Sequence, residues 1–353
     1  MSELHVVTGG AGYFGSRLAE LLHEAGHRVR ILDWNEASGS PRDIEIVRGD
    51  IRDAGAVRAA VEGAAVVHHN VALVPLAKDK AAFFSVNRDG TRQLLEAALR
   101  ARVRKVVHMS SSAVFGAPES NPVGDETVPR PREDYGRAKL AAEELCREYV
   151  ARGLDVTVVR PRTIMGHGRL GIMQILFEWV RRGINVPVLG DGGNRYQFVH
   201  ADDLADAVIR AAGHAGPATF HVGALEFGTM RETLAGLVRH AGTASRVVSV
   251  PNAPATALMH LTSRVGLSPL AAYHALMYGR SMYFDIERTR RELDWTPRFG
   301  NVEMFCESYD WYVAHRDEVM SRRGASHHKS PVNEGILRAV GYALSFAPRA
   351  PAP

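Results

Sequence analysis

A short stretch of the chain carries three hydroxyl side chains after a β-branched run. The run covers residues 104–110, and the adjacent serines are Ser110, Ser111 and Ser112. Tyr135 and Lys139 follow about twenty residues later and are four residues apart, so on a helix they share one face. Tyrosine is a poor base at neutral pH, but a nearby ammonium lowers the pKa of a phenol. A serine, a tyrosine and a lysine together could hold an alcohol and remove its proton.

A glycine-rich loop near the N-terminus has the spacing that suits a dinucleotide. Gly9, Gly12 and Gly15 stand three residues apart in TGGAGYFG, between a strand pattern and a helical pattern. Such glycines bring backbone N–H groups close to a pyrophosphate at a helix N-terminus. Asp33 ends the next strand pattern, where its carboxylate would accept hydrogen bonds from a ribose and repel a 2′-phosphate. The sequence therefore predicts NAD rather than NADP.

Three further residues at strand ends are candidates for the same cofactor. Asp50 and Ile51 close the third strand pattern, where an adenine edge could be held, although Asp50 could equally be a plain turn acid. Asn70 follows the strand pattern AAVVHH and either donates to the cofactor or satisfies the backbone.

The elements that must position these residues alternate between strand and helix. Strand patterns cover 4–10, 28–33, 44–50, 64–70, 104–110 and 154–161, and helical patterns cover 13–25, 78–100 and 135–152. This rhythm predicts an α/β fold with a parallel sheet covered on both faces.

The rhythm changes beyond residue 165. We predict a cofactor domain over 1–165 and a smaller, mostly helical substrate lobe over 166–320, with 198–222 returning to the sheet domain. The composition of 321–353 predicts a basic, partly disordered tail. This tail holds five Lys or Arg and one acid, so it accounts for the whole net charge of +4.

The balanced charge of the remaining body argues against a nucleic-acid surface. Two cysteines, Cys146 and Cys306, form neither a disulfide framework nor a metal cluster, which favours a reducing cytoplasm. The N-terminus has no signal-peptide pattern, and no apolar run is long enough to cross a bilayer. We expect no bound metal, because the paired histidines His68 and His69 alternate on a strand.

The order TGGAGYFG, SSSAVFG and YGRAK resembles that of the extended short-chain dehydrogenase/reductases, the NAD-dependent epimerase/dehydratase family. The resemblance covers roughly residues 4–315. It implies a Rossmann-type doubly wound sheet, a smaller C-terminal substrate lobe, a homodimer, and a nucleotide sugar as substrate. The implied catalytic hydroxyl lies five residues before Gly116, at Ser111, with Tyr135 as base and Lys139 as its partner. The further cofactor contacts that it implies are Tyr13, Phe14, Asn87, Tyr135, Lys139 and Arg160.

Departures from the family pattern bear on the reaction and the substrate. Ala113 stands where sugar dehydratases of this family carry an acid, which disfavours dehydration and retains hydride transfer or epimerisation. Thr163 replaces an asparagine that contacts the sugar diphosphate, and Arg195 lies one residue early for a phosphate contact. The candidate substrate residues are therefore Ser112, Arg162, Thr163 and Arg195.

Two other functions remain open at this point. One is a sterol-like or other secondary-alcohol dehydrogenase that releases NADH. The other is a non-catalytic NAD-binding regulator, against which the complete Ser–Tyr–Lys set weighs.

Overall fold

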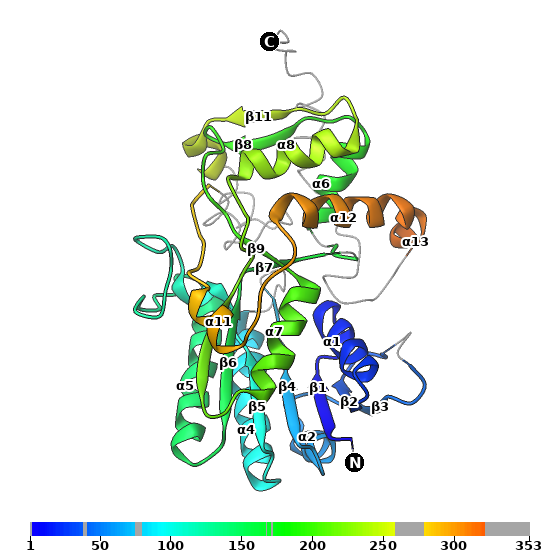
Figure 1. Cartoon of the computed structure of the whole chain (residues 1–353), viewed down its shortest axis with the longest axis vertical. Helices are drawn as coiled ribbons and strands as arrows, with labels where there is room; N and C mark the ends of the chain where they lie inside the picture. Colours follow the sequence, from blue (N-terminus) through cyan, green and yellow to red (C-terminus); the bar gives the residue numbers. More distant parts are fainter. Residues whose placement is uncertain are drawn as a thin grey trace. The chain divides into compact units, whose positions relative to one another are not determined.

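A sheet of parallel strands forms the centre of the molecule's first unit in this computed structural model, which describes residues 2–37, 41–74, 80–166, 168–170, 172–257 and 279–321 (Figure 1). The sheet has seven strands in the order β10-β6-β5-β4-β1-β2-β3. They are β1 Leu4–Thr8, β2 Arg28–Asp33, β3 Glu45–Arg48, β4 Val66–His69, β5 Lys105–Met109, β6 Val156–Pro161 and β10 Ala218–Val222. The strand order reverses between β1 and β4, which confirms the predicted doubly wound fold.

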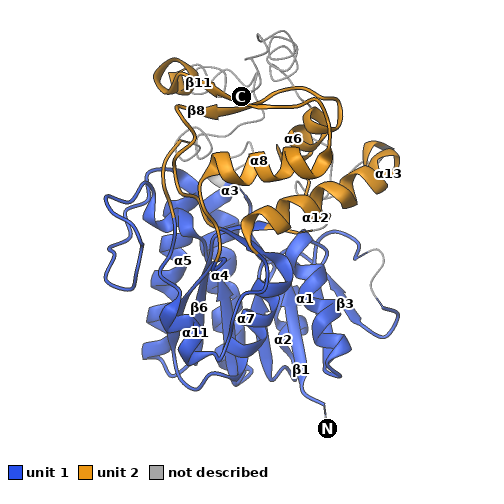
Figure 2. Ribbon diagram, turned by 45° about the horizontal axis from the view of Figure 1, so that its top comes forward, with its two compact units in different colours: residues 1–164, 198–225, 283–299 blue, residues 165–197, 226–282, 300–353 orange. Residues whose placement is uncertain are grey.

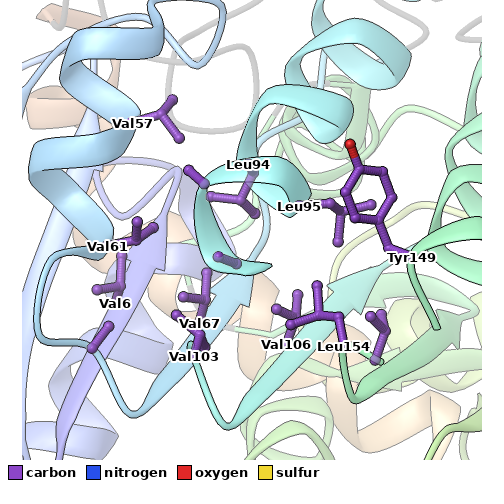
Figure 3. Packing of buried hydrophobic residues seen from close by; sticks show 14 of the residues in the cluster. Val6, Val57, Val61, Val67, Leu94, Leu95, Val103, Val106, Tyr149 and Leu154 are labelled. Carbon is purple, nitrogen blue, oxygen red and sulfur yellow. The ribbon is translucent and has the colours of Figure 1, made fainter. Parts of the chain in front are cut away.

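Helices cover both faces of this sheet. The helices α1 Tyr13–Glu24 and α7 Ala201–Gly213 pack together, and α4 Gly90–Arg100 packs between α2 Ala54–Val61 and α5 Asp134–Ala151. The α2, α4 and α5 face buries a continuous apolar cluster that includes Val6, Val67 and Val106 from the strands (Figure 3). Because β1, β4, β5 and β6 are buried along their whole length, their sequences are mostly apolar runs. The edge strand β3 instead alternates between half-buried and exposed residues.

The register of the strands brings the candidate residues to one edge of the sheet. Thr8 pairs with Leu32 on one side and His69 on the other, and Met109 pairs with Val159. The glycine loop, Asp33, Asn70, the serines and the 160–163 segment therefore leave the sheet at the carboxyl ends of their strands.

The helix predicted over 78–100 is interrupted. Within its described part, α3 Lys80–Phe84 passes into a π-helical turn, η1 Ser85–Asp89, before α4 begins; residues 78 and 79 lie outside the described residues. Asn87 lies in this turn and donates and accepts hydrogen bonds with the backbone of Leu73. The spacing of apolar residues does not reveal such a turn, because the wider hydrogen bonding of a π-helical turn replaces the α-helical pattern over only a few residues.

The chain divides into two compact units (Figure 2). Unit 1 contains Met1–Ile164, Phe198–Leu225 and Tyr283–Phe299, and unit 2 contains the rest of the chain. Unit 1 also holds η2 Ser112–Phe115, β9 Phe198–His200, α11 Glu287–Glu292 and most of β7 Thr163–Met165, which pairs with β9. Unit 2 holds α6 Ile172–Arg181, β8 Val186–Leu189, α8 Met230–Ala241, β11 Val247–Val250, α12 Asn301–Ala314 and α13 Arg316–Ser321. The predicted tail lies outside the described residues from 322 onward.

Candidate active site

The glycine loop between β1 and α1 is closely packed against itself. Gly9 has a φ of +72°, and its carbonyl accepts the N–H of Gly12 at 3.0 Å. A Cβ on Gly15 would lie 2.1 Å from the Gly9 oxygen, so no larger residue fits there. Helix α1 is capped by Gly12 without a side-chain hydrogen bond. Its first N–H groups are therefore placed to bind an anion.

The carboxylate of Asp33 joins this loop to the end of β2. Its Oδ2 accepts the N–H of Ala11 at 3.0 Å and its Oδ1 accepts the N–H of Asn35 at 2.9 Å. An ionised carboxylate has about four acceptor positions, so it can still accept from a ribose diol. The compact glycine loop and this anchored carboxylate fit NAD, with the pyrophosphate at α1 and the adenosine ribose at Asp33.

Two candidate adenine residues, Asp50 and Ile51, have different surroundings. The guanidinium of Arg52 binds the carboxylate of Asp50 and keeps the pKa of that carboxyl below its usual value. Ile51 is buried against Gly90, where a Cβ would lie 2.6 Å from the Ile51 side chain. The Ile51 side chain is therefore held by close packing, and the Asp50 carboxylate is already paired with Arg52.

A buried hydrogen-bond chain holds the segment that follows β4. Thr91 donates to the carbonyl of Asn87 at 2.7 Å, so it accepts from His69 Nε2, while His69 Nδ1 accepts from Thr8. Burial lowers the pKa of His69 to about 3, so this histidine is neutral. Thr8 also accepts the N–H of Asn70, and the Asn70 Oδ1 is buried without a hydrogen-bond partner among the described residues.

The candidate cofactor residue Asn87 supports the same segment. Its amide is buried and bonds Leu73 at 2.8 and 3.0 Å. A contribution of Asn87 to cofactor binding would thus be made through the 70–74 segment. Tyr13 and Phe14, in the first turn of α1, are both buried.

The three serines have three different partners. Ser110 is buried and donates to the carboxylate of Glu143. Ser112 is buried and accepts from Arg162 Nη1 at 2.7 Å. Ser111 is half-buried, and its hydroxyl accepts the N–H of Ala113 at 3.2 Å at the start of η2. As an acceptor there, the Ser111 hydroxyl keeps its own proton available for a substrate oxygen.

Tyr135 and Lys139 lie on the first turns of α5. The ring of Tyr135 packs edge-on against Phe83, with the ring centroids 6.2 Å apart. Lys139 is 2 % exposed, and its ammonium donates to the carbonyl of Met109 at 2.8 Å. This carbonyl ends β5 directly before the serines, so the Lys139 ammonium lies at the strand end that Ser111 follows by two residues. Burial lowers the pKa of Lys139 to about 8, against the opposing effect of Glu143.

The end of β6 carries a buried ion pair. Arg160 binds Glu143 through Nε at 2.9 Å and Nη2 at 2.6 Å, and its Nη1 donates to His221 at 3.3 Å. All three nitrogens of the guanidinium therefore have protein partners. If Arg160 contacts the cofactor, as the sequence predicts, its guanidinium does so while it also binds Glu143.

The candidate substrate residues fall into both units. Arg162 is buried in unit 1 against Ser112, with its guanidinium 5.6 Å from the ring centre of Phe284, and Thr163 is half-buried. Arg195 is exposed and belongs to unit 2, where its guanidinium lies 4.8 Å from the ring centre of Phe227. Arg162 thus contacts one of the serines, and Thr163 follows it in the chain.

The sequence patterns did not reveal two contributions to this site. One is the carbonyl of Met109, because a backbone atom has no signal in the residue type. The other is Glu133, which caps α5 with its carboxylate. The acid at the start of the helical pattern EDYG was a signal for the cap.

The described residues hold no group of three or more His, Cys, Asp or Glu placed to bind a metal ion. In the same part of the chain, no helix is both long and apolar enough to span a membrane.

Several known proteins are similar to this chain in sequence. A protein of Sinorhizobium fredii, the uncharacterized y4nG, is 51 % identical over 344 residues, which cover 97 % of this chain and 87 % of that protein. The sterol demethylase protein B of Methylococcus capsulatus is 38 % identical over 161 residues, covering 43 % of this chain and 48 % of the relative. The UDP-glucose 4-epimerase of Streptomyces lividans is 36 % identical over 164 residues, which cover 44 % of this chain and 50 % of that relative.

A solved structure covers most of the chain. MoeE5 in complex with UDP-glucose and NAD superposes with a TM-score of 0.72 at 25 % identity, covering 89 % of this chain and all of that one. Residues 5–223 match the model of the NAD dependent epimerase/dehydratase family. The chain belongs to the NAD-dependent epimerase/dehydratase family, and its cofactor is NAD.

Proposed function

We propose that this enzyme oxidises a secondary hydroxyl of a nucleoside-diphosphate sugar to a ketone and, as an epimerase, reduces it again from the other face. The observation that carries the proposal is the position of Lys139. Its ammonium is anchored on Met109 beside the serines and stands one helical turn beyond Tyr135. A cation on the same face of the helix can stabilise the phenolate and so lower the pKa of the phenol.

Each side chain has one role in this reaction. Tyr135 removes the hydroxyl proton, Ser111 donates a hydrogen bond to the same oxygen, and Lys139 stabilises the phenolate and binds the nicotinamide ribose. The glycine loop and Asp33 would hold NAD, which would supply the hydride acceptor and donor for this reaction. Ala113 offers no acid for the departure of a neighbouring hydroxyl, so the ketone is not dehydrated.

The substrate class is supported by two named similarities. MoeE5 binds UDP-glucose and NAD, and a relative at 36 % identity is a UDP-glucose 4-epimerase. On the chain itself, Arg162 supplies a buried cation beside Ser112, and Thr163 follows it. We propose that Ser112, Arg162 and Thr163, which all belong to unit 1, contact the sugar nucleotide.

A second candidate function is oxidation of a sterol-like secondary alcohol with release of NADH. It is favoured by Thr163, which replaces the asparagine expected for a sugar diphosphate, and by the 38 % identity to a sterol demethylase protein. The Ser111, Tyr135 and Lys139 chemistry would be the same, because only the group that carries the hydroxyl differs.

Chromatography of enzyme incubated with UDP-, GDP-, CDP- and dTDP-sugars, without added NAD, tests the proposal. A new peak of unchanged mass that Tyr135→Phe abolishes is the expected result. If no peak forms, but sterols or simple alcohols with added NAD yield NADH, the second function replaces the first. NAD binding with no turnover of either class would identify a binding protein and contradict both.

A further inference from the structure

The helix that carries Tyr135 begins with an uncommon cap. Glu133 is the N-cap of α5, and its Oε2 accepts the N–H of Tyr135 at 2.8 Å while its Oε1 accepts the N–H of Gly136 at 2.7 Å. Serine, threonine, aspartate and asparagine are the preferred caps, because a short side chain reaches these amides with little loss of entropy. Here a longer carboxylate binds the backbone of the base itself.

The same turn of α5 is in close contact with the turn that carries Ser111. A Cβ on Gly136 would lie 2.4 Å from the carbonyl of Ala113 and 2.8 Å from Glu133 Oε1. The N–H of Ala113 in turn donates to the Ser111 hydroxyl. One short chain of contacts therefore runs from Glu133 through Gly136 and Ala113 to Ser111. A displaced first turn of α5 would change the separation of the two hydroxyls.

The ionised cap has an energetic cost. Burial raises the pKa of Glu133, and the two amide hydrogen bonds and Arg137 only partly oppose this shift, while Asp134 adds to it. The η2 turn across from it contributes a carbonyl and no charged side chain. The cap of α2, Asp53, also binds two amides but is exposed to water. A neutral cap would bind the α5 amides without burying a charge.

We propose that Glu133 is a positioning residue for the function proposed above: its ionised carboxylate holds Tyr135 in register with Ser111 and Lys139, and protonation releases that hold. A neutral carboxylic acid is a weaker acceptor than a carboxylate, and one of its oxygens becomes a donor. As the pH falls, the cap is therefore lost earlier than the cap of a glutamate with an ordinary pKa would be.

The test follows the phenol of Tyr135 directly and needs no substrate. Near-ultraviolet titration of the NAD-bound protein, with the titration of the matching Tyr135→Phe protein subtracted, reports the pKa of this phenol alone. Glu133→Ala removes the cap, Glu133→Asn keeps a neutral cap, and Asp134→Asn removes a charge at the same helix end without touching the amide of Tyr135.

The sign of the shift separates positioning from simple electrostatics. Loss of a negative charge alone would lower the phenol pKa in Glu133→Ala and in Asp134→Asn alike. Displacement of the Tyr135 ring from Lys139 would raise the phenol pKa, and this rise is expected in Glu133→Ala only. The same displacement should lower kcat by about tenfold to a hundredfold. Glu133→Asn loses the charge but keeps a cap, so its phenol pKa should fall as in Asp134→Asn, and it should retain activity at acid pH where the wild type loses it.

The outcomes distinguish this inference from the proposed function. A wild-type phenol that titrates like an ordinary tyrosine removes the proposed base and overturns both. A low wild-type pKa that stays unchanged or falls in Glu133→Ala overturns the inference and leaves the function standing. Should Glu133→Ala fail to fold, Glu133→Gln keeps the length of the side chain but offers one acceptor oxygen to two amides and, unlike asparagine, is not a preferred cap. An upward shift of the phenol pKa is required of it, and an unchanged or lower value overturns the inference.

Discussion

Two buried lysines lie at opposite ends of β5 and have different surroundings. Lys105 opens the strand, is 1 % exposed, and donates to Asp155, His214 and Gly216 at 2.8 to 2.9 Å. Lys139 reaches the other end, is 2 % exposed, and has the Met109 carbonyl as its one acceptor among the described residues. Burial lowers the pKa of both ammonium groups, but only Lys105 has a carboxylate at hydrogen-bond distance to compensate.

This difference distinguishes Lys105, which forms a structural ion pair, from Lys139, whose ammonium is available to a ligand. All three N–H donors of Lys105 are used inside the protein, so its charge stabilises the contacts that it makes. Lys139 keeps donor capacity for a ribose and a phenolate, and the folded state carries the cost of burying its charge. A buried cation with unused donors at the carboxyl edge of a parallel sheet therefore indicates function.

Replacement of Lys139 is expected to have the largest effect. Lys139→Met removes the charge that stabilises the phenolate and should lower kcat by about a thousandfold. Its free energy of unfolding at pH 7 should not fall, because a buried charge without a carboxylate partner is removed. Turnover and urea unfolding of one preparation measure both; a marked loss of stability with proportionate loss of activity would show that Lys139 is structural.

Lys105→Met should give the reverse result. It leaves Asp155 without its cation, and because that carboxylate is about 30 % exposed, we expect a loss of about 2 kcal/mol in unfolding free energy. The kcat of the folded protein should stay unchanged, since the site lies at the other end of β5. Urea unfolding and active-site-normalised turnover test this. A thousandfold fall in kcat would remove the contrast between the two lysines.

The pH dependence of stability should distinguish the wild type from Lys139→Met. The folded pKa of Lys139, about 8, lies below its unfolded value, so its contribution to stability is present at high pH and is lost as the pH falls through 8. The unfolding free energy of the wild type, minus that of Lys139→Met, should therefore rise by about 1 kcal/mol from pH 7 to 9. A flat or falling difference would show that burial does not penalise this charge.

Ser110→Ala should have the smallest effect. It removes one hydrogen bond to the Glu143 carboxylate, worth about 1 kcal/mol of unfolding free energy, and leaves kcat nearly unchanged. Ser111→Ala is the neighbouring comparison; it also costs about 1 kcal/mol, because the Ser111 hydroxyl caps η2, and it should lower kcat strongly. Thermal unfolding and turnover of the two variants measure this; equal losses of kcat would show that the serines share one role.

Local patterns were sufficient to propose much of the candidate site. The glycine spacing, the acid after the next strand, and the four-residue step from Tyr135 to Lys139 are short-range features, so the sequence predicted them without knowledge of packing. Long-range pairings were beyond such patterns. The sequence did not predict that the Arg160 guanidinium pairs with Glu143 on α5, or that the Asn87 amide holds Leu73. The cofactor contacts expected of both residues stay predictions.

The sequence by itself determined the alternation of strands and helices, the compact glycine loop and the residue types that can move a proton, because these depend on neighbours a few positions apart. Only the tertiary structure decided which buried polar groups use all their hydrogen-bond donors within the protein and which keep donors for a ligand. Lys105 and Lys139 are both lysines beside apolar residues in the sequence; the parallel sheet brings a carboxylate and two carbonyls to one of them and a single strand-end carbonyl to the other. Hydrogen-bond satisfaction depends on which distant segments the fold brings together.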